Sequence, residues 1–243
     1  MAKPSKKQDR REIVEQLRRD QKRAEKKRTY SIIAACTVVA LVIIGLGAYP
    51  LIRQNQAAAG DLETLGTPAG QADCQDPETR TADGSNDHRP DGEAIPYTDG
   101  PPAFGPHYAS PAGFTRKFYS PSDRPPVENL VHNLEHGYNV LWYDETIAED
   151  QEALDVVRGI AQKFEGDEFE NKFIAAPWTA DDGPGFPEGK HVALTHWTGG
   201  DPTGQGEDPQ EGVWQYCAAP SGEVVSQFVE DYPYSDSPEP NAL

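Results

Sequence analysis

The sequence predicts an α+β fold for the outer part of the chain: a small mixed β-sheet with packed helices, preceded by one transmembrane helix and a basic cytoplasmic helix. One observation is that short apolar runs, rich in β-branched and aromatic residues, alternate with amphipathic helical segments. The other is a long uncharged stretch near the N-terminus. The predicted strands are 138–143, 172–178 and 191–197, and the predicted helices are 127–136, 148–166 and 222–232. Residues 212–217 fit either the end of a β element or the start of the last helix.

The uncharged stretch, residues 32–52, has the length of a membrane span. As a helix its 21 residues cover roughly 31 Å, and the hydrocarbon core of a bilayer is about 30 Å thick. A cleaved signal peptide has a shorter apolar core and a shorter charged start, so we interpret this segment as an uncleaved signal anchor. Beyond it we expect a flexible extracytoplasmic stalk, 53–94, which is crowded with turn formers. A globular extracytoplasmic domain with an irregular tail, 95–243, follows.

Charge is divided unevenly along the chain. Residues 1–30 contain 12 Lys or Arg and 5 Asp or Glu, whereas the remaining residues contain 10 and 35. Because cytoplasmic flanks are enriched in basic residues, we expect segment 1–31 in the cytoplasm and the C-terminal domain outside the cell membrane. The basic residues of 18–28 can contact anionic lipids, at roughly 1 kcal/mol each, or simply form a solvated helix. The acidic body would repel a phosphate backbone, so we expect no nucleic-acid partner.

The cysteines agree with this topology. Cys74 and Cys217 lie in the outer part of the chain, whereas Cys36 lies within the predicted span. An even pair in an oxidising compartment predicts one disulfide, which at this separation contributes about 4–5 kcal/mol in the chain-entropy model. No C-x-x-C motif occurs, so a thioredoxin-type redox enzyme has no support.

The stretch VENLVHNLEHG, residues 127–137, is the candidate functional site. We expect a short helix that Gly137 ends in the left-handed conformation. His132 and His136 then lie one turn apart on one face, where both can reach a single metal ion. His107, on a loop braced by proline and glycine, is the best candidate for a third ligand; three histidines suit zinc or copper. Glu135 would orient an imidazole, or act as a general base if the site is catalytic.

Other interpretations of these histidines stay open. Residues 132–136 spell H-x-x-E-H, the inverted zinc-protease signature, but Gly137 ends the helix at once and the five-letter match is weak alone. The histidines can instead be hydrogen-bonded residues of a helix end, where the helix dipole favours them. We interpret His88 as exposed, and His191 and His196 as structural.

The motifs PPAFGPHY, VHNLEHGYNVLWY, ALTHW and PEP occur in this order, and with them the chain resembles the bacterial domain-of-unknown-function family 3105 over roughly 95–239. The resemblance implies a single-span envelope protein with a basic cytoplasmic head and one outer domain. The family has a small residue in place of His196, which is therefore not carried over. The resemblance implies no activity. Its signature positions here are His107, His132, Glu135, His136 and Gly137, with Glu239 matching the terminal Pro-Glu.

We therefore expect a single-pass, membrane-anchored extracytoplasmic protein that serves as a binding or accessory module rather than an enzyme. Its histidine cluster would hold one transition-metal ion, copper or zinc. The first alternative is a non-catalytic structural or interaction subunit of a cell-envelope complex, with structural histidines and an envelope protein as partner. The second is a metal-dependent hydrolase.

Overall fold

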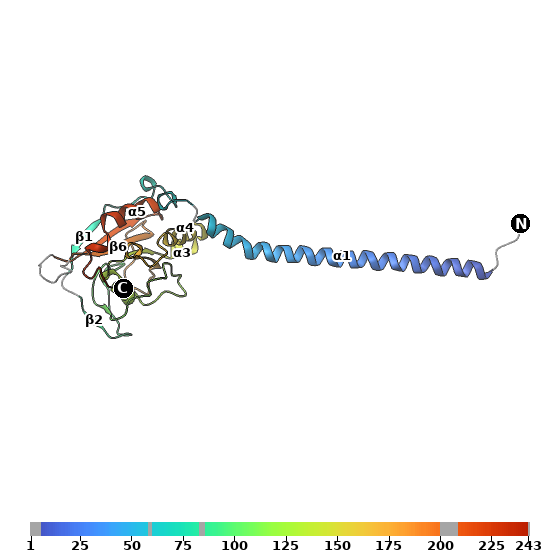
Figure 1. Ribbon diagram of the computed structural model, residues 1–243, viewed down its shortest axis with the longest axis horizontal. Helices are drawn as coiled ribbons and strands as arrows, with labels where there is room; N and C mark the ends of the chain where they lie inside the picture. The colour runs from blue at the N-terminus through green and yellow to red at the C-terminus, as the bar shows by residue number, and fades with distance from the viewer. Residues whose placement is uncertain (1–5, 58–59, 83–85, 200–208, 243) are drawn as a thin grey trace. The chain divides into compact units, whose positions relative to one another are not determined.

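The computed structural model describes residues 6–57, 60–82, 86–199 and 209–242. The remaining residues, which include the start of the basic segment and parts of the predicted stalk and globular domain, lie outside the described residues. By its internal contacts the chain separates into two units, Met1–Ile52 and Arg53–Leu243. Figure 1 shows their elements in chain order.

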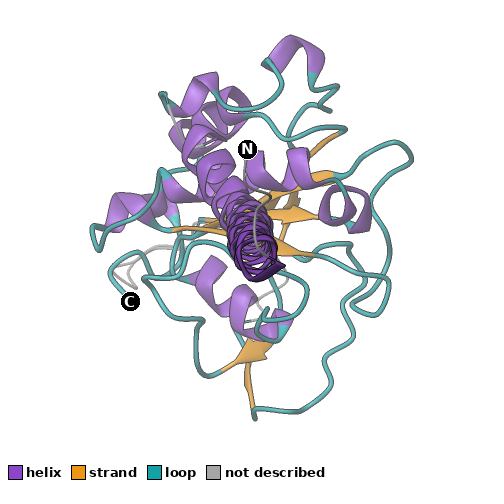
Figure 2. Cartoon of the chain, turned by 90° about the vertical axis from the view of Figure 1, so that its right-hand side faces the viewer, coloured by secondary structure: helices purple, strands orange, loops and turns teal. Residues whose placement is uncertain are grey.

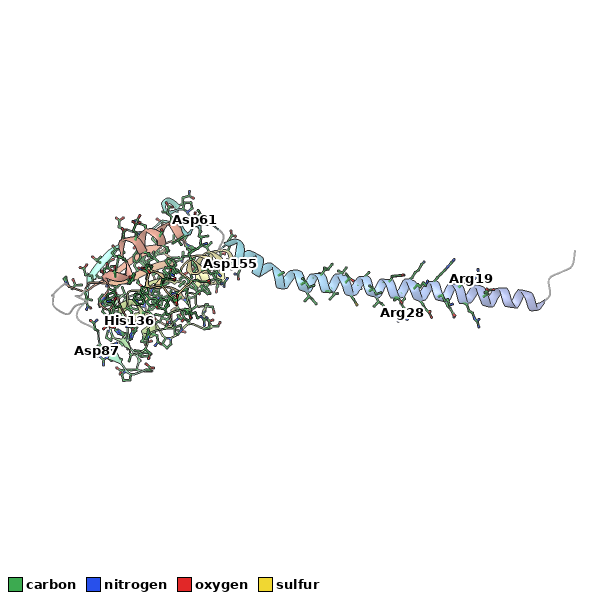
Figure 3. All side chains as sticks on the ribbon, viewed as in Figure 1. Arg19, Arg28, Asp61, Asp87, His136 and Asp155 are labelled. Carbon is green, nitrogen blue, oxygen red and sulfur yellow. A yellow bond between two sulfur atoms is a disulfide. The ribbon has the colours of Figure 1, made fainter. Side chains whose placement is uncertain are left out.

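The described part of the first unit belongs to one long helix, α1 (Lys6–Ala57), whose last residues, 53–57, are counted with the second unit. Its part Gln21–Gly45 is long and apolar enough to cross a membrane: an 18-residue window within it has a mean hydropathy of 1.9 and no buried residue. This candidate overlaps the predicted span 32–52 but begins earlier, because the helix continues without a break from the basic into the apolar stretch. Arg19 and Arg28 project from its basic part (Figure 3).

A five-stranded sheet forms the centre of the second unit, in the order β1-β7-β6-β4-β5. Neighbouring strands are antiparallel except β4 and β5, which are parallel. Two helices, α3 (Glu145–Glu149) and α4 (Gln151–Gln162), connect this parallel pair. The strands are β1 (Glu78–Thr81), β4 (Asn139–Tyr143), β5 (Phe173–Pro177), β6 (Val192–Thr198) and β7 (Glu211–Cys217). The α+β prediction is therefore confirmed, and residues 212–217 are a strand.

Both faces of the sheet are covered, as Figure 2 shows. On β4, Leu141 and Tyr143 pack with residues of α4 and of α5 (Gly222–Asp231). The alternate residues Val140 and Trp142 pack with α2 (Val127–Glu135) on the opposite face. Since successive side chains of a strand point to opposite faces, a strand covered on both sides is apolar throughout. This explains the unbroken apolar run that the sequence shows there.

The segment before residue 95 contributes to this unit. It contains the 3₁₀ turns Leu62–Thr64 and Ala69–Gln71, and strand β1 pairs with β7. The predicted disulfide joins Cys74 to Cys217. For these residues the structure differs from the irregular stalk expected over 53–94. The reason is that β1, with the sequence Glu-Thr-Arg-Thr, is an exposed edge strand, so it carries no apolar pattern.

The other edge of the sheet, β5, is covered by the chain around Lys117. Ala175 donates its N–H to the Lys117 carbonyl at 2.8 Å, and Tyr119 donates to the Ala175 carbonyl at 2.9 Å. The Lys117 side chain is buried, where its Nζ donates to the Asn171 carbonyl at 2.6 Å. Burial lowers the pKa of Lys117 to about 8.

This lowered pKa predicts a pH-dependent stability. The folded pKa of Lys117 lies near 8 and the ordinary value is 10.5, so the unfolded chain binds more protons between these two pH values. The wild type should therefore gain stability relative to Lys117→Met as the pH rises through this window, by up to about 3 kcal/mol. Urea unfolding of both full-length chains in detergent, from neutral pH to about pH 10, measures the difference. A difference that stays constant with pH contradicts the prediction.

Candidate metal centre

Helix α2 positions three of the candidate residues. Its apolar side chains Leu130, Val131 and Leu134 are fully buried against the sheet. This packing leaves His132 and Glu135 on the part of the helix that contacts β3 (His107–Tyr108). The helix ends as predicted: His136 follows it, and Gly137 has a φ of 90°, which an L side chain rarely adopts.

A second, very small sheet brings two further histidines to the same place. Strand β2 (His88–Arg89) pairs in parallel with β3, and the register sets His88 opposite His107. Their rings lie 4.8 Å apart between centroids, and the His88 ring lies 5.1 Å from that of His132. His88 keeps 47% of its side chain exposed, whereas His107 and His132 are buried.

Hydrogen bonds to the backbone fix the orientation of the two buried rings. The Nδ1 atom of His107 lies 2.8 Å from the Gly105 carbonyl oxygen, and Nδ1 of His132 lies 2.6 Å from that of Tyr108. A carbonyl oxygen can only accept, so both Nδ1 atoms carry the hydrogen. Nε2 is then the ring nitrogen left for a metal ion: in His132 it faces Nε2 of His136, and in His107 it faces the Glu135 carboxylate.

Glu135 lies among these rings with 1% of its side chain exposed. One carboxylate oxygen, Oε2, is 2.9 Å from His107 Nε2 and 3.7 Å from His88 Nε2, and the other accepts from the Asn86 amide. Burial alone would raise the pKa of Glu135, but the hydrogen bonds from His107 and Asn86 and the nearby imidazoles bring it below its ordinary value. The carboxylate is thus anionic and fully engaged, which gives no support to a freely exposed general base.

The cluster continues past the end of α2. Nε2 of His132 lies 2.9 Å from Nε2 of His136, which in turn lies 3.5 Å from Oε2 of Glu239. Burial, followed by the proximity of His107 and His88, lowers the pKa of His132 against the opposing effect of the Tyr108 carbonyl. His132 is therefore uncharged at neutral pH, and its Nε2 lone pair is directed at Nε2 of His136.

Among the described residues, two overlapping groups have ligand atoms within 4.8 Å of one another: His88, His107 and His132, and His132, Glu135 and His136. The structure thus brings the predicted His107 close to His132, and His132 close to His136, without uniting the three in one such group. Ligand atoms on a tetrahedral zinc ion are roughly 3.3 Å apart, so small ring movements suffice. The sequence did not reveal His88, because a two-residue bridge leaves no periodic pattern.

The two remaining histidines are bound within the fold. Nδ1 of His191 lies 2.8 Å from a carboxylate oxygen of Asp144. His196 is buried, with its ring nitrogens 3.2 Å from the Tyr138 carbonyl and 2.9 Å from Asp236. All three partners are hydrogen-bond acceptors, which agrees with structural roles for the two histidines.

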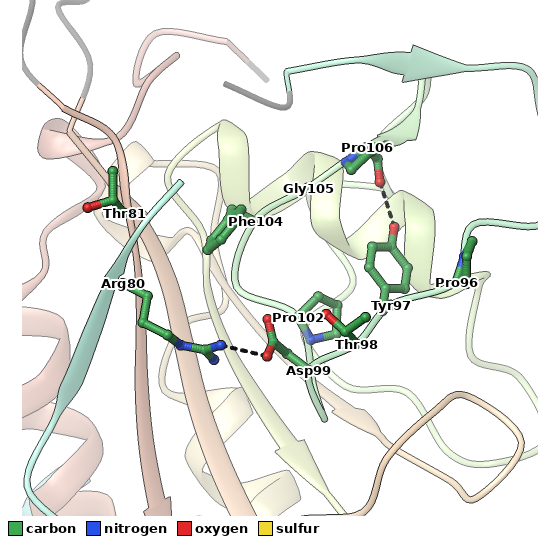
Figure 4. Close-up of a pocket in the computed structure, with 10 residues that line it drawn as sticks. All are labelled: Arg80, Thr81, Pro96, Tyr97, Thr98, Asp99, Pro102, Phe104, Gly105 and Pro106. Atoms are coloured by element: carbon green, nitrogen blue, oxygen red, sulfur yellow. Dashed lines mark hydrogen bonds and ion pairs between the residues drawn. The ribbon is translucent and has the colours of Figure 1, made fainter. Parts of the chain in front are cut away.

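The loop that carries His107 is braced from its other side, at a surface pocket of 340 Å³ (Figure 4). Tyr97 donates its hydroxyl to the Pro106 carbonyl at 2.8 Å, and Arg80 donates to Asp99 at 2.7 Å across the pocket. The Tyr97 bond holds the Gly105–Pro106 backbone, and with it the Gly105 carbonyl that orients His107. The pocket is lined by Arg80, Thr81, Pro96, Tyr97, Thr98, Asp99, Pro102, Phe104, Gly105 and Pro106.

Gly137 should be intolerant of a side chain. A Cβ there would contact the Tyr234 carbonyl oxygen and lie 2.7 Å from the Ser237 hydroxyl, in a backbone conformation that is strained for any L residue. Gly137→Ala should therefore lower the free energy of unfolding by about 2 kcal/mol or more. Gly113→Ala is the control, because no described atom lies within 4 Å of its Cβ position. Thermal unfolding of the two full-length variants compares them, and equal effects would contradict the prediction.

Comparison with known proteins agrees with the motifs. A search of curated proteins and a search of solved structures found no match. The family model described as "Protein of unknown function (DUF3105)" matches residues 88–243, which is more than half of the chain and begins at His88 of the cluster. The chain therefore belongs to the DUF3105 family.

Proposed function

We propose that this chain is a single-pass membrane protein whose outer domain binds one divalent transition-metal ion through His88, His107 and His132. The observation that carries the proposal is the pair of Nδ1–carbonyl hydrogen bonds at His107 and His132. Metal-ligating histidines characteristically donate their second ring nitrogen to a carbonyl or carboxylate, which sets the tautomer and the ring orientation.

The surroundings of the rings favour a cation. Glu135 contributes a buried negative charge 2.9 Å from His107 Nε2, at a contact that requires a proton between the two atoms. A metal ion on Nε2 would replace that proton and be attracted by the same carboxylate. Binding should then release protons and weaken in acid, as it does wherever ligands must be deprotonated.

The ligand types point to the class of metal. The chain has three cysteines and one methionine: Cys74 and Cys217 are joined in the disulfide, Cys36 is in α1, and the methionine is Met1. Among the described residues, the two groups of candidate ligands contain no sulfur. Imidazole nitrogens with a carboxylate suit Zn²⁺, Cu²⁺ or Ni²⁺ better than Cu⁺.

The anchor and the disulfide support a location at the cell membrane with the domain outside. Helix α1 contains one stretch that can span a bilayer, preceded by the basic residues of 18–28. Basic flanks stay on the cytoplasmic side, and a disulfide persists in an oxidising compartment. The protein would therefore bind the ion outside the cytoplasm.

Metal titration of the full-length protein in detergent tests the proposal. We expect one Zn²⁺ or Cu²⁺ per chain, and an electron paramagnetic resonance spectrum of the Cu²⁺ form with coupling to imidazole nitrogen. His132→Gln should weaken binding by at least the ~10–100-fold that loss of an outer hydrogen-bond partner costs in known sites. His191→Gln should bind as the wild type does, because His191 lies outside the cluster.

Circular dichroism without metal checks that His132→Gln is folded; if it is not, the Cu²⁺ spectrum of the wild type decides alone. A wild-type chain that takes up neither Zn²⁺ nor Cu²⁺ at micromolar concentration rules the proposal out. The histidines would then serve only the fold, as in the alternative of a structural envelope subunit.

A further inference from the structure

The second half of the cluster offers another set of ligand atoms next to the first. Nε2 of His136 lies 2.9 Å from Nε2 of His132 and 3.5 Å from the Glu239 carboxylate. Two imidazoles and a carboxylate are a common zinc ligand set. His132 belongs to two groups whose ligand atoms lie within 4.8 Å of one another, one with Glu135 and His136 and the other with His88 and His107, and Glu239 borders the first of these through His136.

The chain holds Glu239 at this place through its backbone. The buried Lys172 donates to the carbonyls of His136, Pro240 and Ala242 at 2.7, 2.8 and 2.7 Å, and so ties the end of α2 to the C-terminal segment. The Glu239 N–H donates to the Glu135 carbonyl at 3.0 Å. The carboxylate therefore approaches His136 from a fixed backbone, although 52% of its side chain is exposed.

His132 can serve only one ion at a time. Its Nδ1 hydrogen is committed to the Tyr108 carbonyl at 2.6 Å, so Nε2 carries the single lone pair available to a metal. An ion held by His132 can have His88 and His107 as further ligands, or His136 together with Glu239 once the exposed Glu239 side chain turns from His136 toward the ion. The buried charge of Glu135 borders both arrangements, because its atoms lie close to His107 and within 4.8 Å of the ligand atoms of His132 and His136.

Each arrangement has one solvent-exposed ligand at its outer end. His88 is 47% exposed and Glu239 is 52% exposed, whereas the shared His132 is buried. We propose that a single ion has two alternative positions that share His132, one completed by His88 and the other by Glu239, and that it moves between them by ligand exchange. This inference rests on the proposed function. It makes the domain a metal-transfer module, in which the ion can be reached through either of two partly exposed ligands, rather than a static site.

Two alternative positions predict a specific pattern of affinities. The observed association constant is the sum over both positions, so removing His88 or Glu239 alone leaves one complete position. Removing both leaves none. The double variant should therefore lose at least ~10-fold more affinity than the product of the two single losses, a coupling that a single fixed site does not give.

The experiment measures Zn²⁺ affinity by competition with a fluorescent chelator, on the full-length protein in detergent. It compares the wild type, His88→Ala, Glu239→Ala, the double variant, and Glu230→Ala as the control for loss of an exposed glutamate. We expect one Zn²⁺ per chain in the wild type, wild-type affinity for Glu230→Ala, and the excess loss in the double variant. Both single substitutions remove partly exposed side chains, so the fold should persist.

Several results would overturn the inference. If the loss in the double variant equals the product of the single losses, or is smaller, the ion has one position. Two Zn²⁺ ions bound at once would mean simultaneous rather than alternative sites. In both cases the proposed metal binding stands, whereas a wild-type chain that binds no ion removes the proposed function and this inference together.

Discussion

Two hydrogen bonds from histidine to backbone, His107 to Gly105 and His132 to Tyr108, are the constraint on which the arrangement of the cluster depends. They are set by chain geometry: the Gly105–Pro106 loop is held by Tyr97, and the Tyr108 carbonyl belongs to β3 beside α2. Because both bonds use Nδ1, both rings present Nε2 to the same region. A change of tautomer would break these buried bonds, so the fold determines which ring nitrogen of His107 and His132 carries the hydrogen.

The charges within the cluster follow from its burial. The pKa of His132 is lowered first by burial and then by the neighbouring imidazoles of His107 and His88, because both effects disfavour the charged ring. The pKa of Glu135 is lowered for a different reason: hydrogen bonds and neighbouring imidazoles favour its charged form more than burial disfavours it. A neutral His132 next to an anionic Glu135 is a favourable combination for a cation and an unfavourable one for an anionic ligand.

Local sequence patterns predicted the parts of the fold that depend on local physics. Apolar periodicity and the position of Gly137 predicted the helix before this glycine, the strands around 140, 175 and 195, and the last helix. Long-range pairing was not accessible in this way. His88 joins the cluster through a two-residue parallel bridge, and β1 joins the sheet with four polar residues. The role of Lys172 was also not predicted. Its acceptors are backbone carbonyls of His136, Pro240 and Ala242, and the sequence does not indicate that the end of α2 contacts the C-terminal segment.

The two edge strands of the central sheet have a consequence for how copies of the protein behave at high local concentration. Unpaired strands recruit strands from neighbouring molecules, and apolar ones do so most readily. Here β1 presents alternating charge and threonine, and β5, which is apolar, already has its hydrogen bonds taken by residues 117–119. Pairing of the sheets of neighbouring copies is thus disfavoured, so the domains of residues 53–243 can act as separate molecules.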